Sequence, residues 1–521
     1  MKLLEIKEAS IWASEKFNRK ITPHNISYLI NYGKIRKIQK NNKNYVLLQE
    51  LESYYKSLLA QEKKYKEKYP DISWELSFDW VKESERTKHV HRLHPYKGKF
   101  IPQLVEYFLD EHIDNLKKEV YFRKGDIVID PFAGSGTTLV QAKELGIHSI
   151  GVDISPFNAF IANVKLIEVD FNGLEVEINK ILKELDKFIK EKNYILFEAE
   201  LTKYLTNFNN RFFPSPEFKI KVRSKKIDEK EYGKEKEKEF LSIYESLLRK
   251  YRISLKNRGD SFLDRWYIKS IREEIEFLFK KIENIENPKI KKVVMLILSR
   301  TIRSCRATTH SDLATLKEPQ LTPYYCKKHG KICKPLFSLK DWFKRYSKDT
   351  IKRLKEFDKL KQNVYARCFV GDSRNINLFE EIEDKKFLEY FKTKKAKGIF
   401  TSPPYVGLIN YHQQHEYAYE LFGFERKDDL EIGAMFKGSG KKAQEEYVEG
   451  ISQVLKNMQK YLVDNSDIFV VANDKYNLYP EIAKKAGLKI VNEFKRPVLN
   501  RVEKDKKPYA ESVFHMKKEK K

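Results

Sequence analysis

Apolar positions along the chain follow two different rhythms. In 126–165 and again in 365–516, short apolar runs alternate with segments of helical spacing, which is typical of a parallel sheet with helical crossovers. Between these stretches, from Gly173 to about Leu360, the pattern is charge-laced and mostly helical. The predicted strands are DIVID, HSIGVD, YARCFVGD, KGIF, DIFVVAND, KIVNEF and SVFHM. We therefore expect an α/β fold in which a large helical insertion interrupts a mostly parallel sheet of seven strands.

The first sixty residues have a pattern of their own. Leu3 to Phe17 has helical spacing, Thr22 and Pro23 mark the start of a second helix, and 36–48 alternates like two strands around a polar turn. This order resembles the winged helix of excisionases and mercury-type regulators, whose second helix enters a DNA groove. The alternative is a helical cap with a solvated basic hairpin. The resemblance places four basic residues on the wing: Arg36, Lys37, Lys40 and Lys43.

These patterns divide the chain into four predicted segments. They are a winged-helix-like DNA-binding unit at 1–60, the first part of a Rossmann-like domain at 61–172, an inserted helical domain at 173–360 and the second part of the Rossmann-like domain at 361–521.

Charge favours a nucleic-acid partner. The chain has 102 Lys and Arg against 75 Asp and Glu, a formal net charge of +27. Codon bias or heat adaptation explains a high density of charge but not its sign, so a polyanion is the better explanation. The four cysteines form no disulfide framework, MKLLEIKEAS lacks the apolar core of a signal peptide, and no apolar run approaches the roughly 20 residues that cross a bilayer. We expect a cytoplasmic protein without a membrane role.

A glycine-rich stretch follows the first predicted strand. In DPFAGSGTT, residues 130–138, Gly134 and Gly136 allow the backbone to turn sharply and approach a ligand closely. Asp153 ends the next predicted strand, where a nucleotide fold has the acceptor for a ribose hydroxyl. Leu139 replaces the third glycine of the NAD fingerprint, and no lysine follows the glycine as in a P-loop. The stretch predicts a ligand that carries a ribose.

This stretch resembles motif I, D-x-F-x-G-S-G-T, of the S-adenosylmethionine-dependent DNA amino-methyltransferases. The resemblance implies that the loop passes under the methionine part of S-adenosylmethionine and that Asp153 binds the ribose. HPYKGKFIPQL, residues 94–104, resembles motif X of the same family, and GDSR, residues 371–374, resembles the motif whose acid binds the adenine amine. The cofactor-binding residues expected from these motifs are Phe100, Pro102, Asp130, Phe132, Gly134, Ser135, Gly136, Asp153 and Asp372.

A second loop, TSPPY, follows the predicted strand KGIF. It resembles motif IV of the family, D-P-P-Y or S-P-P-Y, and two prolines make such a loop rigid. The expected catalytic residues are Thr401, Ser402, Pro403, Pro404 and Tyr405. Ser402 and the Pro403 carbonyl would accept the hydrogens of a base amine, and Tyr405 would stack on a base flipped out of the duplex.

The first residue of the proline loop bears on the target base. In the family, S-P-P-Y is typical of cytosine N4 methylation, and adenine N6 enzymes more often carry Asp or Asn at the position of Ser402. Methylation at carbon 5 needs a cysteine after a proline, and no cysteine of this chain follows one. We expect methylation of cytosine N4, with adenine N6 as the alternative.

The long insertion is expected to recognise the DNA sequence, although a shorter excursion, 407–444, is a second candidate. Within 299–334, Arg300, Arg303 and Arg306 are candidate contacts to bases or phosphate, with Thr308, Thr309 and His310 as further donors; the alternative is a solvated basic helix end. Cys305, Cys326, His329 and Cys333 are candidate zinc ligands. Because their spacing is loose, we interpret the cysteines as reduced bystanders, with the zinc site as the alternative.

The combined hypothesis is a site-specific enzyme that methylates the N4 amine of a flipped cytosine in double-stranded DNA, in a restriction-modification system with a cognate endonuclease. An RNA amine methyltransferase is a further possibility. A non-enzymatic DNA-binding regulator is the hypothesis from a different class, and the intact Gly134, Gly136, Asp153 and Tyr405 argue against it.

Overall fold

The computed structural model describes residues 2–19, 21–41, 43–78, 81, 83–96, 98–192, 194–310, 318–335, 338–497 and 510–519. By packing, the chain falls into two compact units, each assembled from three segments. We call 71–183, 275–304 and 340–521 the sheet unit, and 1–70, 184–274 and 305–339 the hairpin unit. Within the described part of the chain, we find no helix with the length and apolar character that crossing a membrane requires.

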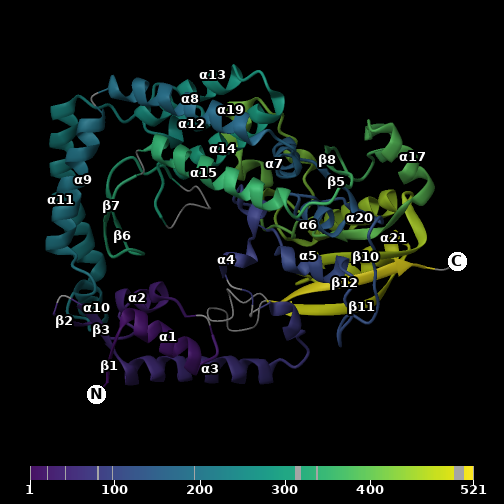
Figure 1. The fold of residues 1–521 in the computed structure, drawn as a ribbon, viewed down its shortest axis with the longest axis horizontal. Helices are drawn as coiled ribbons and strands as arrows, with labels where there is room; N and C mark the ends of the chain where they lie inside the picture. The colour runs from purple at the N-terminus through teal and green to yellow at the C-terminus, as the bar shows by residue number, and fades with distance from the viewer. Residues whose placement is uncertain are drawn as a thin grey trace. The chain divides into compact units, whose positions relative to one another are not determined.

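The sheet unit is built on a seven-stranded sheet with the order β11-β12-β10-β9-β4-β5-β8. Figure 1 labels β5 and β8 of this sheet, and β10, β11 and β12 near the C-terminus. The bounds of its strands are β4 Ile127–Asp130, β5 His148–Asp153, β8 Ala366–Val370, β9 Ala396–Thr401, β10 Leu462–Ala472, β11 Leu488–Pro497 and β12 Ala510–Lys518. All neighbouring pairs are parallel except those of β12, which runs antiparallel to both β10 and β11. The prediction of a mostly parallel seven-stranded sheet is confirmed.

The order of the strands creates a crevice at one edge of this sheet. The chain passes from β4 to β5 on one side and returns, much later, to β9 on the other side of β4. In open parallel sheets, the loops that leave two such neighbours diverge, and ligands bind between them at the carboxyl ends of the strands. The end of β4 is therefore the expected place for a site.

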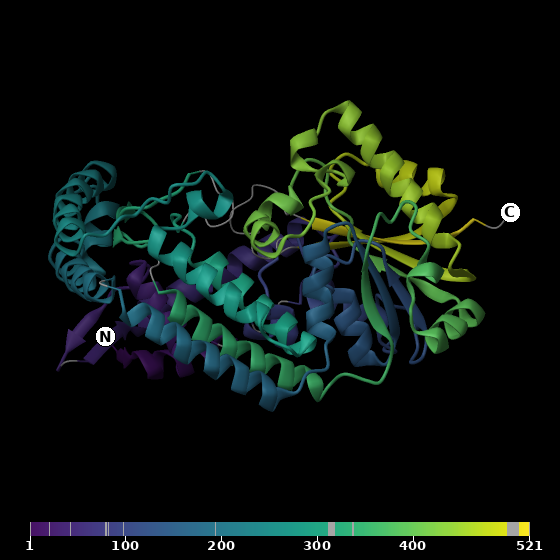
Figure 2. The same cartoon turned by 90° about the horizontal axis from the view of Figure 1, so that it is seen from above.

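Helices cover both faces of the sheet (Figure 2). Because side chains alternate along a strand, Ile399 joins a core with α17, α20 and α21 on one face, whereas Phe400 joins a core with α5 and α6 on the other. The helices of the sheet unit are η1 Trp74–Ser77, α4 Glu83–Arg86, η2 His89–Arg92, α5 Pro102–Leu109, α6 Thr137–Leu145, α7 Pro156–Leu166, α14 Pro288–Ser304, α15 Leu339–Asp358, α16 Leu378–Glu381, α17 Lys385–Lys394, α18 Tyr411–Gln414, α19 Glu416–Phe422, η3 Asp428–Leu430, η4 Met435–Lys437, α20 Lys441–Gln459 and α21 Tyr479–Ala486.

The hairpin unit begins with a small three-stranded sheet, ordered β1-β3-β2. Its strands and helices are β1 Leu3–Glu5, α1 Ile6–Lys16, α2 Pro23–Asn31, β2 Ile38–Lys40, β3 Lys43–Leu47, α3 Leu48–Lys68, α9 Tyr194–Phe212, α10 Glu217–Arg223, α11 Glu229–Tyr251, α12 Phe262–Trp266, β6 Tyr324–Cys326 and β7 Lys331–Cys333. The side chain of Thr22 caps α2 and Pro23 opens it, as predicted. The element order agrees with the expected pattern, and the assignment as a winged helix stays a prediction.

The predicted insertion, 173–360, does not pack as one body. Within the sheet unit, α14 contacts α7 and α19, and Arg300 of α14 pairs with Asp349 of α15 at 2.6 Å. The helices α8 Phe171–Lys190 and α13 Lys269–Glu283 each begin in one unit and end in the other. The insertion is mostly helical, but it also contains the hairpin β6–β7, which the sequence pattern did not reveal.

Candidate active site at the carboxyl edge of the sheet

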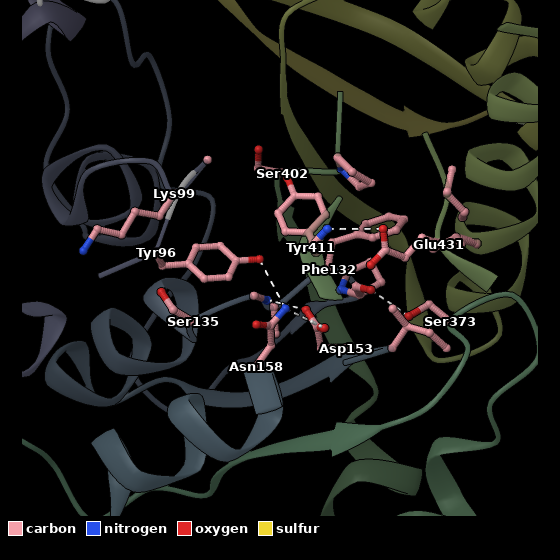
Figure 3. A pocket seen from close by; sticks show the side chains of 18 of the residues that line it. Tyr96, Lys99, Phe132, Ser135, Asp153, Asn158, Ser373, Ser402, Tyr411 and Glu431 are labelled. Atoms are coloured by element: carbon pink, nitrogen blue, oxygen red, sulfur yellow. Dashed lines mark hydrogen bonds between the residues drawn. The ribbon is translucent and has the colours of Figure 1, made fainter. Parts of the chain in front are cut away.

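A pocket opens at the carboxyl ends of four parallel strands of the sheet unit. Its walls come from the loops after β4, β5, β8 and β9, together with Tyr96 and residues 98–100 and 430–432 (Figure 3). Gly134 of the glycine loop and Ser402 and Pro404 of the proline loop line the same pocket. The two loops predicted to carry the chemistry therefore share one cleft.

The two glycines of the glycine loop have different tasks. Gly134 has φ +49°, and a Cβ there would lie 3.0 Å from the hydroxyl oxygen of Tyr96 inside the pocket. Gly136 has φ +75°, and its Cβ would lie 2.7 Å from the Cβ of Ala162 on α7. The absence of a side chain at Gly134 thus leaves space in the pocket beside Tyr96, whereas Gly136 allows α6 and α7 to pack closely.

Asp153 fixes the glycine loop from the neighbouring strand. Its carboxylate accepts the backbone N–H of Gly134 at 2.8 Å and that of Ser155 at 2.9 Å, and the side-chain amide of Asn158 donates to it at 3.1 Å. The same amide group of Asn158 donates to the hydroxyl of Tyr96 at 3.3 Å (Figure 3). Burial raises the pKa of Asp153.

A buried hydrogen bond joins the two loops. Asp130, the last residue of β4, accepts the hydroxyl of Thr401, the last residue of β9, at 2.6 Å. Burial raises the pKa of Asp130 to about 6, against the lowering effect of its hydrogen bonds with Thr138, Thr401 and the backbone of Phe132. On the other side, the hydroxyl of Ser373 donates to the carbonyl of Pro131 at 2.6 Å. The loops after β4, β8 and β9 are thus held together below the pocket.

The proline loop divides between the pocket and the core. Thr401 and Pro403 are buried, whereas Ser402 and Pro404 line the pocket. The half-buried ring of Tyr405 packs against the core that α20 and α21 cover, and its hydroxyl donates to Glu511 of β12 at 2.9 Å. Glu511 in turn pairs with Arg496 of β11 at 2.7 Å. The ring of Tyr405 is therefore anchored at both ends.

Comparisons with known proteins agree with this geometry. Residues 5–163 match the family model of a DNA methylase family that covers N6 and N4 enzymes. The Type II methyltransferase M.MjaII of Methanocaldococcus jannaschii is 49% identical over 526 residues, which cover 99% of this chain and 97% of that protein. The chain belongs to the family of Type II DNA methyltransferases.

Other relatives of this family match short stretches. The Type II methyltransferase M.BsoBI of Geobacillus stearothermophilus is 37% identical over 90 residues, 17% of this chain and 16% of that protein. The Type II methyltransferase M2.DpnII of Streptococcus pneumoniae is 41% identical over 80 residues, 15% of this chain and 27% of that protein. No solved structure matches the chain significantly.

DNA methyltransferases of this family use S-adenosylmethionine as methyl donor, and the polar atoms of the pocket fit such a ligand. The hydroxyl of Ser135 and the carbonyl oxygen of Asn158 are buried and have no hydrogen-bond partner among the described residues, and both residues line the pocket. Buried polar atoms are rarely left unpaired in a folded protein. Two such atoms on residues that line one cavity fit a site that binds a polar ligand.

Not every residue expected to bind the cofactor lies in the pocket wall. Phe100, Phe132, Gly134, Ser135, Asp153 and Asp372 line it. Pro102 is buried at the start of α5, and Asp130 and Gly136 support the loops from behind. The carboxylate of Asp372 is engaged by Arg374, which donates to both of its oxygens. These roles in cofactor binding stay predictions.

Sequence reasoning missed several residues of the pocket. Tyr96 lies within the stretch quoted for motif X, so that motif already contained it, and Asn158 lies five residues after Asp153 on α7. Tyr411 and Glu431 come from the excursion 407–444, which offered no signal. Glu431 is buried, accepts the backbone N–H of His412 at 2.9 Å and pairs with the ring of His412.

The residues expected to contact DNA lie in different surroundings. The guanidinium of Arg300 stacks on Tyr346 and pairs with Asp349, and Arg306 is buried. Arg303 is half-buried, as is Lys37, and Lys40 is exposed. Arg300 and Arg306 thus make contacts within the protein, whereas the side chain of Lys40 is accessible to solvent. The DNA contacts of all these residues stay predictions.

Proposed function

We propose that this chain transfers a methyl group from S-adenosylmethionine to the exocyclic amine of a base flipped out of duplex DNA, and that the base is cytosine, methylated at N4. The observation that carries the proposal is the shared pocket. Gly134 and Ser402 line one cleft, and the Asp130–Thr401 hydrogen bond fixes the strand ends from which they extend. Donor and acceptor can be oriented in such a cleft, and orientation is a large part of catalysis between two bound reactants.

The cofactor would lie over the glycine loop. Ser135 and Asn158 offer the open polar atoms for its methionine end, and Asp153 retains lone pairs that can accept ribose hydroxyls beside the N–H groups that it already binds. Bound there, the cofactor supplies an electrophilic methyl group on a sulfonium. The half-buried ring of Tyr96 at this wall would shield the group from water.

The proline loop would activate the amine. A base amine is a weak nucleophile because its lone pair is delocalised into the ring. Hydrogen bonds from the amine to the hydroxyl of Ser402 and the carbonyl of Pro403 would favour the pyramidal nitrogen that attacks a methyl group. Because the two prolines fix the loop, these acceptors need little reorganisation during the reaction.

Ser402 is also the residue that favours cytosine N4 over adenine N6, since the loop sequence S-P-P-Y resembles that of the cytosine enzymes. Tyr405 would stack on the flipped base, and its bond to Glu511 keeps the ring from rotating away.

The relatives named as Type II methyltransferases support a restriction-modification context with a partner endonuclease.

The experiment incubates purified protein with plasmid DNA and labelled S-adenosylmethionine, digests the DNA and identifies the modified nucleoside by mass. We expect N4-methyldeoxycytidine in one short sequence context. N6-methyldeoxyadenosine would contradict the choice of base while leaving the reaction class intact. Methylation of RNA but not of DNA would contradict the substrate, and DNA binding without transfer would favour the regulator.

A further inference from the structure

The hairpin unit brings four metal-ligating side chains together. His310, Cys326, His329 and Cys333 each present a ligand atom, and these four atoms all lie within 4.8 Å of one another. Cys326 and Cys333 are buried at opposite ends of the antiparallel hairpin pairing, in which Cys326 faces Lys331 and Tyr324 faces Cys333. His329 stands in the turn between the strands, and His310 comes from the chain segment that follows α14.

The spacing of these atoms agrees with a tetrahedral zinc site. Zinc bonds of about 2.3 Å to sulfur and 2.0–2.1 Å to nitrogen place a sulfur and a nitrogen ligand about 3.6 Å apart at two corners of a tetrahedron. The Nδ1 atom of His329 lies 3.4 Å from the sulfur of Cys333 and 3.6 Å from that of Cys326. The sulfur of Cys326 lies 3.8 Å from Nδ1 of His310.

Surrounding residues fix the hairpin that carries three of the four ligands. The side-chain amide of Asn209 on α9 donates to the carbonyl of Ile332 at 2.9 Å and accepts its N–H at 3.0 Å. In the turn, the N–H of Gly330 donates to the carbonyl of Cys326 at 2.7 Å, and its φ of +63° suits glycine. These hydrogen bonds therefore fix the backbone that carries Cys326, His329 and Cys333.

Tyr324 positions the fourth ligand. Its hydroxyl accepts the backbone N–H of His310 at 2.7 Å and lies 2.6 Å from Nδ1 of the same residue. A metal bound through that nitrogen would replace the second contact and keep the first. Tyr324 would thus hold the backbone of His310 in place while the imidazole ring of His310 turns toward the metal.

The hairpin itself is short, and it depends on other parts of the hairpin unit for its stability. Each strand has three residues, and among the described residues the buried apolar cluster of the hairpin consists of Tyr324, Cys326 and Cys333. A two-stranded hairpin of this size is at best marginally stable in water. A metal ion that links both strands and the segment after α14 would supply folding energy that the apolar contacts do not.

We propose that this chain binds one structural zinc ion through His310, Cys326, His329 and Cys333. The proposal differs from the set expected from the sequence in one ligand. Cys305 is buried in a different environment, where burial, and after it the charges of Glu274 and Glu198, raises the pKa of its thiol. His310 takes the place that the sequence assigned to Cys305, so the cysteines of the hairpin are not bystanders.

The test measures zinc in the full chain, purified without chelator from zinc-supplemented medium. We expect about one zinc ion per chain, and a Co²⁺-substituted protein with a thiolate-to-cobalt charge-transfer band. The double substitution Cys326→Ser and Cys333→Ser, and His310→Gln alone, should lower the zinc content by about tenfold or more. Cys305→Ser is the matched control and should retain the zinc.

A second group of buried ligand-type residues, His89, His91 and Glu144 in the sheet unit, makes the cobalt measurement necessary. That group contains no thiol, so cobalt bound there gives no thiolate band, and His91→Gln should leave the band intact. Wild-type protein without zinc and without a thiolate band on Co²⁺ titration would overturn the proposal. Zinc retained by the double cysteine variant that also carries His91→Gln would overturn it as well. Zinc lost from Cys305→Ser but kept by His310→Gln would overturn the choice of the fourth ligand.

Discussion

The pocket at the sheet edge and the Cys–His group of the hairpin unit are two polar sites built in opposite ways. In the pocket, the carboxylates of Asp130 and Asp153 are already bonded to neighbouring loops, whereas the buried hydroxyl of Ser135 and the side-chain carbonyl of Asn158 have no hydrogen-bond partner among the described residues. In the hairpin, the ligand atoms converge on one another within 4.8 Å. A large organic ligand needs rigid walls with a few open polar atoms, whereas a metal ion needs only converging donors.

The largest expected effect concerns the proline loop. Ser402→Ala removes one acceptor for the base amine, so methyl transfer in a single turnover should fall by about 10²–10³-fold, the usual cost of losing one preorganised hydrogen bond at a reacting group. DNA affinity and zinc content should not change. Ser224→Ala, at an exposed serine that follows α10, is the control. Unchanged transfer in Ser402→Ala would remove the serine from the reaction.

Tyr405 separates stacking from anchoring in the same assay. Tyr405→Ala should abolish transfer, because the flipped base loses its stacking surface. Tyr405→Phe keeps the ring and loses the hydroxyl that donates to Glu511, so it should retain most of the activity. Equal losses in both variants would show that the ring acts through its hydroxyl and not through stacking.

The pocket was predictable from sequence because each of its motifs is continuous and ends a strand. Gly134, Asp153 and Ser402 each follow or end an apolar run, and parallel strands bring such ends to one edge of the sheet. The bond between Asp130 and Thr401 spans 271 positions, and no local pattern announces a contact of that kind. No sequence pattern predicted that Glu431 lines the pocket, because its position depends on how residues 407–444 fold.

The hairpin shows the limit of pattern reading more sharply. The strands β6 and β7 have three residues each, which is too short for the alternation of apolar and polar residues to be recognised. The strand β7 also begins with a charged residue, Lys331. His310 lies 16 positions before Cys326, outside the short ligand spacings that mark a zinc motif. The predicted boundaries at 60, 172 and 360 follow changes of texture, whereas the packing of α14 and α15 in the sheet unit depends on contacts far apart in the chain.

Asp130 should make the free energy of unfolding depend on pH. Its pKa of about 6 lies above the ordinary 3.8, so between these values the folded state holds a proton that the unfolded state has released. The free energy of unfolding should therefore fall as the pH rises from about 4 to about 6, by up to about 3 kcal/mol, and then stay level. Asp130→Asn should lack this fall in urea unfolding. Asp464→Asn, at a fully exposed side chain, is the control and should keep it.

Asn158 tests whether the open polar atoms of the pocket serve the cofactor. Asn158→Ala removes one of them together with the amide that donates to Asp153 and Tyr96. The affinity for S-adenosylmethionine, measured by calorimetry, should fall by at least about tenfold, the worth of one good hydrogen bond. Asn179→Ala, at an exposed position of α8, is the matched control. The double cysteine variant of the hairpin should bind the cofactor as the wild type does. A loss of affinity there would contradict the separation of the two sites.

The smallest effect concerns the basic strand of the hairpin unit. Lys37 and Lys40 belong to the predicted wing, where they would contact phosphate and not bases. Replacing both by Gln should weaken binding to all duplex sequences alike and make the slope of log affinity against log salt shallower by about 2, because each phosphate contact contributes about 0.9. Lys385 and Lys386 on α17, exposed on the sheet unit, are the control pair. A loss confined to the recognition sequence would instead assign base contacts to this strand, because neutralised phosphate charge cannot distinguish one sequence from another.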